Sequence, residues 1–152
     1  MDAPGDVAQR VIDAVNAHDL RALRALYLAS ARTLRPGWPE EAGPEYLLAS
    51  YEMDFACVPD IKFEPRSSTT DGDRIVTELR ITGTNTGPTV LGDFGKALLG
   101  RDVDAVPPTG RPIDLPAVLV HEIKDRKVAA ERQYWGLLEF LVQIGVIGNS
   151  SP

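Results

Sequence analysis

The sequence predicts an α+β fold in which three N-terminal helices pack on a curved antiparallel sheet around an internal cavity. Apolar residues recur at helical spacing before residue 58, and they alternate with polar residues from Ile61 onward. Helices followed by a run of strands are typical of the α+β class. The chain has 152 residues, 43% of them apolar and 25% charged. These values are those of one globular domain, and we assign residues 1–152 to it.

Two short helices come first. Apolar side chains recur every three or four residues over residues 7–18 and again over residues 20–26. Asp19 lies between the two stretches, where its carboxylate is suited to cap the second helix. A short strand over residues 32–35 follows, and it ends at Pro36-Gly37.

A third helix is predicted over residues 44–58. Pro44 suits the first turn of a helix, and Pro59 ends the helix because it disfavours helical backbone in the residue before it. Leu47, Tyr51 and Phe55 fall on one stripe, which is the face expected to cover the sheet.

The rest of the chain alternates like strands. Residues 61–87 predict a long hairpin with its turn at residues 71–73, and residues 113–123 and 128–135 predict a second pair around the charged turn 124–127. The Gly- and Pro-rich residues 88–112 form an irregular excursion with a short helix near residues 94–99. A final helix covers residues 137–146. A curved sheet folded around helices leaves a cone-shaped cavity, which is a typical site for a small molecule.

Charge and composition exclude several classes of function. The formal charge is −6, and no window clusters Lys and Arg as nucleic-acid binders do. Cys57 is the single cysteine, so no internal disulfide forms, and its apolar neighbours favour a buried, inert thiol. The first residues lack the features of a secretory signal, and no apolar run approaches the roughly 20 residues of a membrane span. We therefore expect a cytoplasmic protein.

Motifs for cofactors and metals are missing from the sequence. The segment around Gly95-Lys96 lacks the first glycine and the Ser or Thr of a phosphate-binding loop. The chain contains no histidine pair at ligand spacing, no cysteine cluster and no Gly-x-Ser-x-Gly elbow. We expect a pocket without a cofactor or a metal, and its partner is a hydrophobic or aromatic small molecule.

Five short motifs resemble those of the SnoaL-like polyketide cyclases, a branch of the NTF2-like superfamily. They are Asn16-Ala17-His18-Asp19, Val58-Pro59-Asp60, Gly83-Thr84-Asn85-Thr86-Gly87, Pro108-Thr109-Gly110-Arg111 and Gln143-Ile144-Gly145. Their order and spacing cover nearly the whole chain. The resemblance implies an NTF2-like α+β barrel. It also implies cofactor-independent chemistry on a polyketide-derived or polycyclic intermediate of antibiotic biosynthesis, by enolisation or ring closure.

Two positions depart from the family pattern. Asn85 stands where the family commonly has the histidine of a His-Thr-Gly motif. Gly136 stands where the last strand commonly delivers an Asp that serves as acid and base. The family's aldol-type ring closure therefore needs another acid in this chain. A non-catalytic binding or accessory protein, and a hydroxylase or epoxide-opening relative, stay open as alternatives.

His121 is the first candidate for that acid and base. If Asp125-Arg126 is a two-residue turn, His121 lies opposite Ala130, and its face of the hairpin is the more apolar one. An inward His121 is then one of few polar groups in the cavity. The alternative is an ordinary strand histidine bonded to a neighbour, and a turn longer by one residue reverses the facing.

Three further residues are candidates for catalysis. Asn85 either points inward and stabilises an oxyanion or only satisfies the turn that follows it. Arg132, on the same predicted face as His121, either holds an anionic substrate or reaches solvent. Asp54 is the nearest replacement acid, and the alternative is a solvated helix carboxylate.

Aromatic residues complete the predicted pocket. Trp38, Tyr51, Phe55 and Tyr134 either line the cavity beside Gly136 or pack in the core. The opposite face of the last two strands carries Val118, Val120 and Trp135, which a lone monomer would expose. We therefore expect a homodimer that forms through this face of the sheet.

Overall fold

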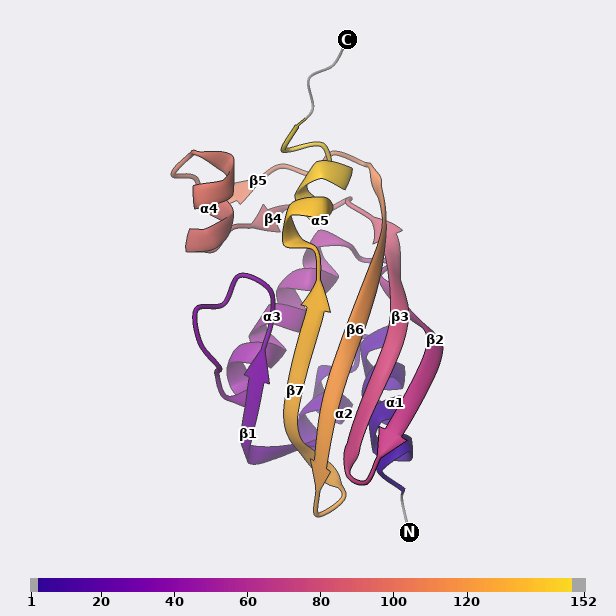
Figure 1. The fold of residues 1–152 in the computed structure, drawn as a ribbon. Coiled ribbons are helices and arrows are strands. Elements are labelled where there is room, and N and C mark those ends of the chain that lie inside the picture. The colour runs from indigo at the N-terminus through magenta and orange to yellow at the C-terminus, as the bar shows by residue number, and fades with distance from the viewer. Residues whose placement is uncertain (1–2, 149–152) are drawn as a thin grey trace.

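The computed structural model describes residues 3–148, which form one five-stranded sheet with helices on one face (Figure 1). The helices are α1 (Pro4–Asn16), α2 (Leu20–Ala25), α3 (Pro44–Cys57), α4 (Asp93–Leu99) and α5 (Leu137–Gln143). The strands are β1 (Tyr27–Leu34), β2 (Lys62–Asp71), β3 (Arg74–Thr84), β4 (Thr89–Val90), β5 (Ala105–Val106), β6 (Pro112–Lys124) and β7 (Lys127–Trp135). The predicted α+β class is confirmed.

The strand order in the main sheet is β1-β7-β6-β3-β2. The hairpins β2–β3 and β6–β7 are antiparallel, as is the central β3–β6 pair. The edge pair β1–β7 is parallel, so the prediction of a purely antiparallel sheet is wrong there. The strand predicted over residues 32–35 also begins earlier, because backbone pairing with β7 extends it back to Tyr27.

The three N-terminal helices cover one face of the sheet (Figure 1). Asp19 caps α2 as predicted, because its Oδ1 accepts a hydrogen bond of 2.9 Å from the backbone N of Ala22. Asn16, at the end of α1, joins its side-chain amide to the backbone N and O of Phe63 in β2, at 2.8 and 2.9 Å. Those two bonds fix the helical layer against the edge of the sheet.

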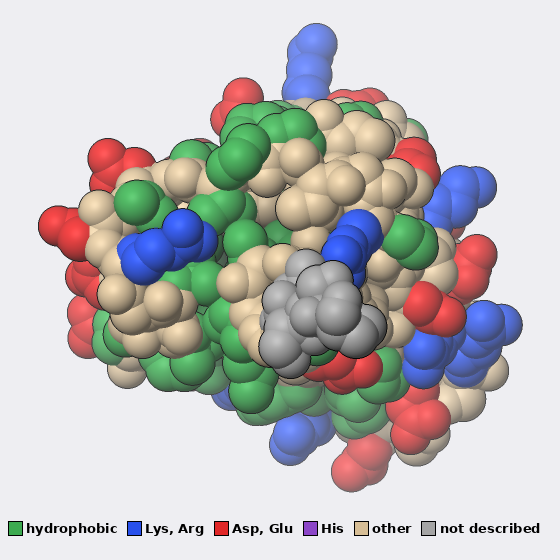
Figure 2. All heavy atoms as spheres, turned by 90° about the horizontal axis from the view of Figure 1, so that it is seen from above, with side chains coloured by type: hydrophobic (Ala, Val, Ile, Leu, Met, Phe, Trp, Pro, Cys, Tyr) green, Lys and Arg blue, Asp and Glu red, His purple; other side chains and the backbone are tan. Residues whose placement is uncertain are grey.

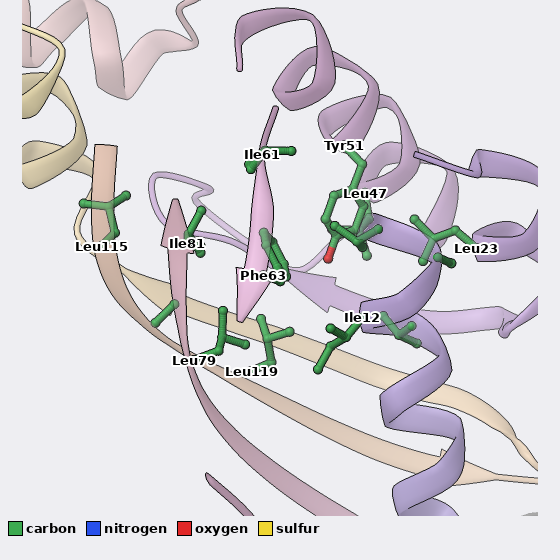
Figure 3. Packing of buried hydrophobic residues seen from close by; sticks show 14 of the residues in the cluster. Ile12, Leu23, Leu47, Tyr51, Ile61, Phe63, Leu79, Ile81, Leu115 and Leu119 are labelled. Atoms are coloured by element: carbon green, nitrogen blue, oxygen red, sulfur yellow. The ribbon is translucent and has the colours of Figure 1, made fainter. Parts of the chain in front are cut away.

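One apolar core fills the space between the helices and the sheet. Ile12, Leu23 and Leu47 from the helices meet Leu79 and Leu119 from the central strands, and all five are almost fully buried (Figure 3). The excursion over residues 88–112 forms α4 and the small β4–β5 sheet, which lie with α5 at one end of the molecule (Figure 1). No helix within residues 3–148 is both long and apolar enough to cross a bilayer.

A bulge in the β6–β7 hairpin makes the β7 side chains point to the opposite faces of the sheet from those predicted. Asp125 and Arg126 have φ of 52° and 60°, so the predicted two-residue turn is confirmed. The pairing shifts by one residue just beyond it, because Ile123 faces Val128 but Glu122 faces Ala130. A bulge of this kind reverses the phase of side chains beyond it.

The reversal exchanges the two faces of β7. His121 therefore lies opposite Glu131, not Ala130. Glu131 and Gln133 are 0% and 2% exposed, whereas Tyr134 is 51% exposed. The predicted inward facing of Arg132 and Tyr134 is wrong, and so is the outward facing of Trp135.

Candidate active site

A half-open cavity of about 60 Å³ lies between α3, the upper part of the sheet and α5. Three strand residues form its floor, since Phe63, Ile81 and Leu115 face one another across β2, β3 and β6 (Figure 3). Most of the lining is apolar. The lining residues are Arg35, Asp54, Cys57, Val58, Ile61, Phe63, Ile81, Ile113, Leu115, Gln133, Trp135 and Phe140.

An ion pair between Arg35 and Asp54 forms part of the wall. Arg35 directly follows β1, and Asp54 projects from the third turn of α3 toward it. The Arg35 Nη2 atom is 2.8 Å from Asp54 Oδ2 and 3.1 Å from Oδ1. The two side chains are 8% and 26% exposed, so the pair is largely removed from water.

Burial and pairing act in opposite directions on this pair. Burial raises the pKa of Asp54, and the charge and hydrogen bond of Arg35 offset only part of that rise. Burial alone would lower the pKa of Arg35, but attraction to Asp54 leaves that pKa raised. The pair therefore combines a carboxyl that accepts protons more readily than usual with a fixed positive charge.

Two aromatic rings hold the Arg35 guanidinium in place. Its Cζ lies 5.7 Å from the centre of the Tyr51 ring and 5.5 Å from that of Trp135. Both distances are within the range of cation–π attraction. Arg35 is thus oriented before any ligand arrives, which is the condition for stabilising charge that develops on a bound molecule.

A buried polar network lies beside the cavity. The Glu131 carboxylate accepts hydrogen bonds from Tyr27, Tyr51 and Gln133 and is 2.8 Å from His121 Nε2. Burial by itself would raise the pKa of Glu131, but the hydrogen bond and charge of His121, with those of its other partners, lower it to about 2. Burial and the nearby Glu131 charge raise the pKa values of Tyr27 and Tyr51 well above 10.0.

His121 belongs to this network and does not line the cavity. Its side chain is fully buried, and its Nε2 forms a hydrogen bond with Glu131. Nδ1 has no hydrogen-bond partner within residues 3–148. The structure therefore favours the plainer of the two interpretations, a strand histidine bonded to a neighbour.

Asn85 has all of its amide groups engaged by the protein. Its Nδ2 donates to the Gly87 carbonyl at 3.0 Å and approaches Cys57 and Thr89, while its Oδ1 accepts from the Thr109 backbone N at 2.9 Å. These bonds join the end of β3 to the returning excursion. Asn85 thus stabilises the loops beyond the end of β3 and does not line the cavity.

The remaining predicted residues also lie outside the cavity lining. Arg132 pairs with Glu122 at 3.1 Å on the outer face of the sheet, where Tyr134 is exposed as well. Gly136 is the N-cap of α5. The structure therefore does not gather these three residues with Asp54.

The other predicted aromatic residues serve as packing. Trp38 packs against Tyr46, with ring centres 4.7 Å apart, and Phe55 stacks on His18 at 4.1 Å. Tyr51 is 1% exposed, and the Arg35 guanidinium lies over its ring.

Asp54 is thus the one predicted site residue that lines the cavity. The sequence analysis did not identify Arg35, Gln133 and Trp135 as site residues. Arg35 stands at the end of a strand before Pro36-Gly37, and nothing in that pattern names its partner 19 residues away. The predicted hairpin register placed Trp135 on the outer face, and Gln133, two residues earlier on the same strand, goes with it; the observed register turns both inward. Within residues 3–148, no three His, Cys, Asp or Glu side chains are grouped to hold a metal ion.

Solved structures of similar fold cover almost the whole chain. A proposed SnoaL-like polyketide cyclase from Jannaschia sp. CCS1 is 24% identical, with a TM-score of 0.77 over 98% of this chain and 93% of that one. IdmH, a proposed polyketide cyclase from Streptomyces antibioticus, is 22% identical, with a TM-score of 0.75 over 95% and 99%. AclR, a proposed hydroxylase from Streptomyces galilaeus, is 18% identical, with a TM-score of 0.76 over 98% and 84%. At these identities the likeness establishes the fold alone.

No curated protein sequence matches this chain. The family described as "SnoaL-like domain" matches residues 8–131, which is most of the chain and includes β1, β2, β3, β6 and the first half of β7. The protein therefore belongs to the SnoaL-like domain family.

Proposed function

We propose that this protein is a cofactor-independent enzyme that enolises, and thereby cyclises or isomerises, a polyketide-derived or polycyclic intermediate of natural-product biosynthesis. One observation carries the proposal: the Arg35–Asp54 pair stands in the wall of an otherwise apolar cavity. Two solved structures of similar fold are described as polyketide cyclases, which supports the substrate class.

The pair supplies the two groups that enolisation needs. Asp54 removes a proton from the carbon next to a substrate carbonyl, and its raised pKa suits it to hold that proton. The Arg35 guanidinium stabilises the negative charge that moves onto the carbonyl oxygen. The enolate carbon then attacks a second carbonyl of the same molecule, a carbon–carbon bond forms, and Asp54 returns its proton to the new alkoxide.

The size of the cavity adds a condition. A volume of about 60 Å³ accommodates a few water molecules and is too small for a bicyclic ligand. Trp135 and Phe140, both partly buried, therefore have to move for such a ligand to enter. Hydrophobic side chains form several patches on the end of the molecule with α4 and α5 (Figure 2). Phe94 of α4 and Leu138 and Val142 of α5 are about half exposed.

Deuterium exchange tests the chemistry without knowledge of the natural substrate. The bicyclic ketone 2-tetralone is incubated with protein in D₂O, and loss of its α-proton signals is followed by NMR. Asp54→Asn should lower the protein-dependent rate by roughly 10²-fold, the usual contribution of a positioned acid or base. Glu52→Gln, an exposed carboxylate on the same helix, is the matched control and should leave the rate unchanged. Equal rates for wild type and Asp54→Asn would refute the proposed role.

A non-catalytic ligand-binding protein is the second candidate. It is favoured by the engagement of both Asp54 oxygens by Arg35 and by the glycine at position 136. In that case 2-tetralone binds, which titration calorimetry detects, and no variant changes the exchange rate. A hydroxylase or epoxide-opening activity is a third candidate, and the similar fold of AclR, a proposed hydroxylase, supports the first of these.

We also propose that two copies associate through the outer face of the sheet. Trp135 does not contribute to that face, since it lines the cavity, but Val118 and the exposed Tyr134 border a groove of about 320 Å³ there. Arg66 and Glu78 border it as well. A second copy of the same face would cover these apolar side chains.

Light scattering tests the association. Wild type should have about twice the monomer mass of 16.5 kDa at micromolar concentration, and Val118→Glu should return it to the monomer mass because it places a charge in the contact. A wild-type mass near 16.5 kDa would contradict the proposal.

A further inference from the structure

Glu131 is a buried carboxylate that determines which atoms around it donate hydrogen bonds and which accept them. It is 0% exposed and has the side chains of His121, Tyr27, Tyr51 and Gln133 within hydrogen-bond distance. With a pKa of about 2 it is ionised at neutral pH, and an ionised carboxylate is only an acceptor. Each of its partners therefore has to donate to it.

Because Glu131 only accepts hydrogen bonds, two contacts fix the orientation of the Gln133 amide. The single hydroxyl hydrogen of Tyr51 is donated to Glu131 Oε2 at 3.0 Å, so the Tyr51 oxygen is left to accept from Gln133 Nε2 at 2.7 Å. Gln133 Nε2 also donates directly to Glu131 Oε2 at 2.8 Å. Both amide hydrogens are thus used. A rotated amide would set its oxygen against the carboxylate, where two acceptors repel.

With both amide hydrogens turned toward Tyr51 and Glu131, the Gln133 oxygen points toward Trp135, a second residue of the cavity lining. Gln133 lines the cavity, and its Oε1 accepts from Trp135 Nε1 at 3.2 Å. A carbonyl oxygen has two acceptor sites, so one remains for a ligand. Arg35 can only donate, and it is held over the rings of Tyr51 and Trp135. The polar part of the wall therefore offers a hydrogen-bond acceptor, Gln133 Oε1, and a donor, Arg35. The side chains of Tyr51 and Trp135 contact both residues.

We infer that Gln133 selects ligands that carry a hydroxyl donor, an enol or a phenol, beside a carbonyl, and that Glu131 is the positioning residue that fixes the Gln133 amide for this selection. The enol of a 1,3-dicarbonyl has this pattern, with its hydroxyl on Gln133 and its carbonyl oxygen on Arg35. The inference rests on the proposed function, because it assigns the specificity of the same cavity.

Phenol and anisole are the probes, because they differ in one methyl group that removes the hydroxyl donor. Their dissociation constants are measured by NMR titration for each variant. Gln133→Met keeps the length of the side chain, and the ratio of phenol affinity to anisole affinity should fall roughly 3- to 10-fold, the value of one hydrogen bond. Gln9→Met, an exposed amide on α1, is the matched control and should keep the wild-type ratio.

Glu131→Gln tests the positioning role. A glutamine at position 131 can donate as well as accept, so the Gln133 amide can rotate and the affinity ratio should fall as in Gln133→Met. The ratio separates positioning from general damage, because a loosened fold weakens both probes. If Glu131→Gln does not fold, Tyr51→Phe removes one of the two acceptors of Gln133 Nε2 and should lower the ratio by a smaller factor.

An unchanged ratio in Gln133→Met, or a wild type that binds neither probe, would overturn the inference. A lower ratio in Gln133→Met with an unchanged ratio in both Glu131→Gln and Tyr51→Phe would overturn the positioning role. Asp54-dependent deuterium exchange with an unchanged ratio leaves the enzyme proposal standing. A Gln133-dependent ratio without exchange supports the inference and contradicts the enzyme.

Discussion

Glu131 is expected to make this protein sensitive to acid through one buried group, and Glu131→Gln should remove that sensitivity. The carboxyl has its ordinary pKa near 4.5 in the unfolded chain and a pKa of about 2 in the fold. A lowered pKa in the fold means that the unfolded chain takes up the proton first as pH falls. The stabilisation is therefore complete above about pH 5 and is lost as the pH falls toward 2.

The magnitude follows from the two pKa values. Each pKa unit corresponds to about 1.36 kcal/mol, so lowering the pKa from 4.5 to about 2 contributes about 3 kcal/mol to the free energy of unfolding. Glu131 is 0% exposed, so solvent screening does not reduce this value. A contribution of this size is a large share of the stability of a typical domain.

Urea unfolding at pH 7, 5, 4, 3 and 2, followed by circular dichroism, provides the measurement. Wild type should lose about 3 kcal/mol more than Glu131→Gln between pH 7 and pH 2, because only the wild type has the group that titrates. Glu122→Gln is the matched control. Glu122 lies next to His121 on β6 but on the outer face, where its partly exposed pair with Arg132 is worth at most about 1 kcal/mol. A pH dependence of Glu131→Gln that parallels that of wild type would refute the reasoning.

Three further predictions concern single positions. Gly87→Ala should cost about 3 kcal/mol or more in thermal unfolding, because its Cβ would lie 1.8 Å from a backbone carbonyl oxygen of α3. Gly43→Ala is the control, since a Cβ at position 43 has open space around it. Equal melting temperatures for the two variants would contradict this prediction. His121→Ala should cost about 3–5 kcal/mol in urea unfolding, because it removes the one basic partner of the buried Glu131 carboxylate and leaves only neutral donors around it. A fully stable variant would argue against the pair. Gly136→Asp should not raise the 2-tetralone exchange rate, because position 136 caps α5 and does not line the cavity; a clear gain would return the family's acid to this strand end.

Local patterns in the sequence were sufficient to predict most of the elements. The periodicity of residues 7–18 and 44–58 predicted α1 and α3 to within three residues of their ends. Alternation predicted the β2–β3 and β6–β7 hairpins, and the Asp19 cap was predicted from residue type. These features depend on neighbours within a few positions along the chain, so the sequence specifies them directly. The family motifs, which are also local, led to the SnoaL-like domain.

The parallel β1–β7 edge and the candidate site were decided by tertiary structure. Parallel pairing joins residues about 100 positions apart, and no local pattern identifies such a partner. Neither Arg35 nor Asp54 stands out in the sequence, and the two residues meet because α3 packs against β1, the edge strand of the sheet.

The bulge after the 125–126 turn had the largest effect on the functional interpretation. One additional residue in β7 turned Glu131, Gln133 and Trp135 inward and Arg132 outward. Strand side chains alternate with a period of two, so a single extra residue exchanges the buried and exposed sets. The sequence specified which polar residues β7 carries. The backbone hydrogen bonding between strands decided which of them face the cavity.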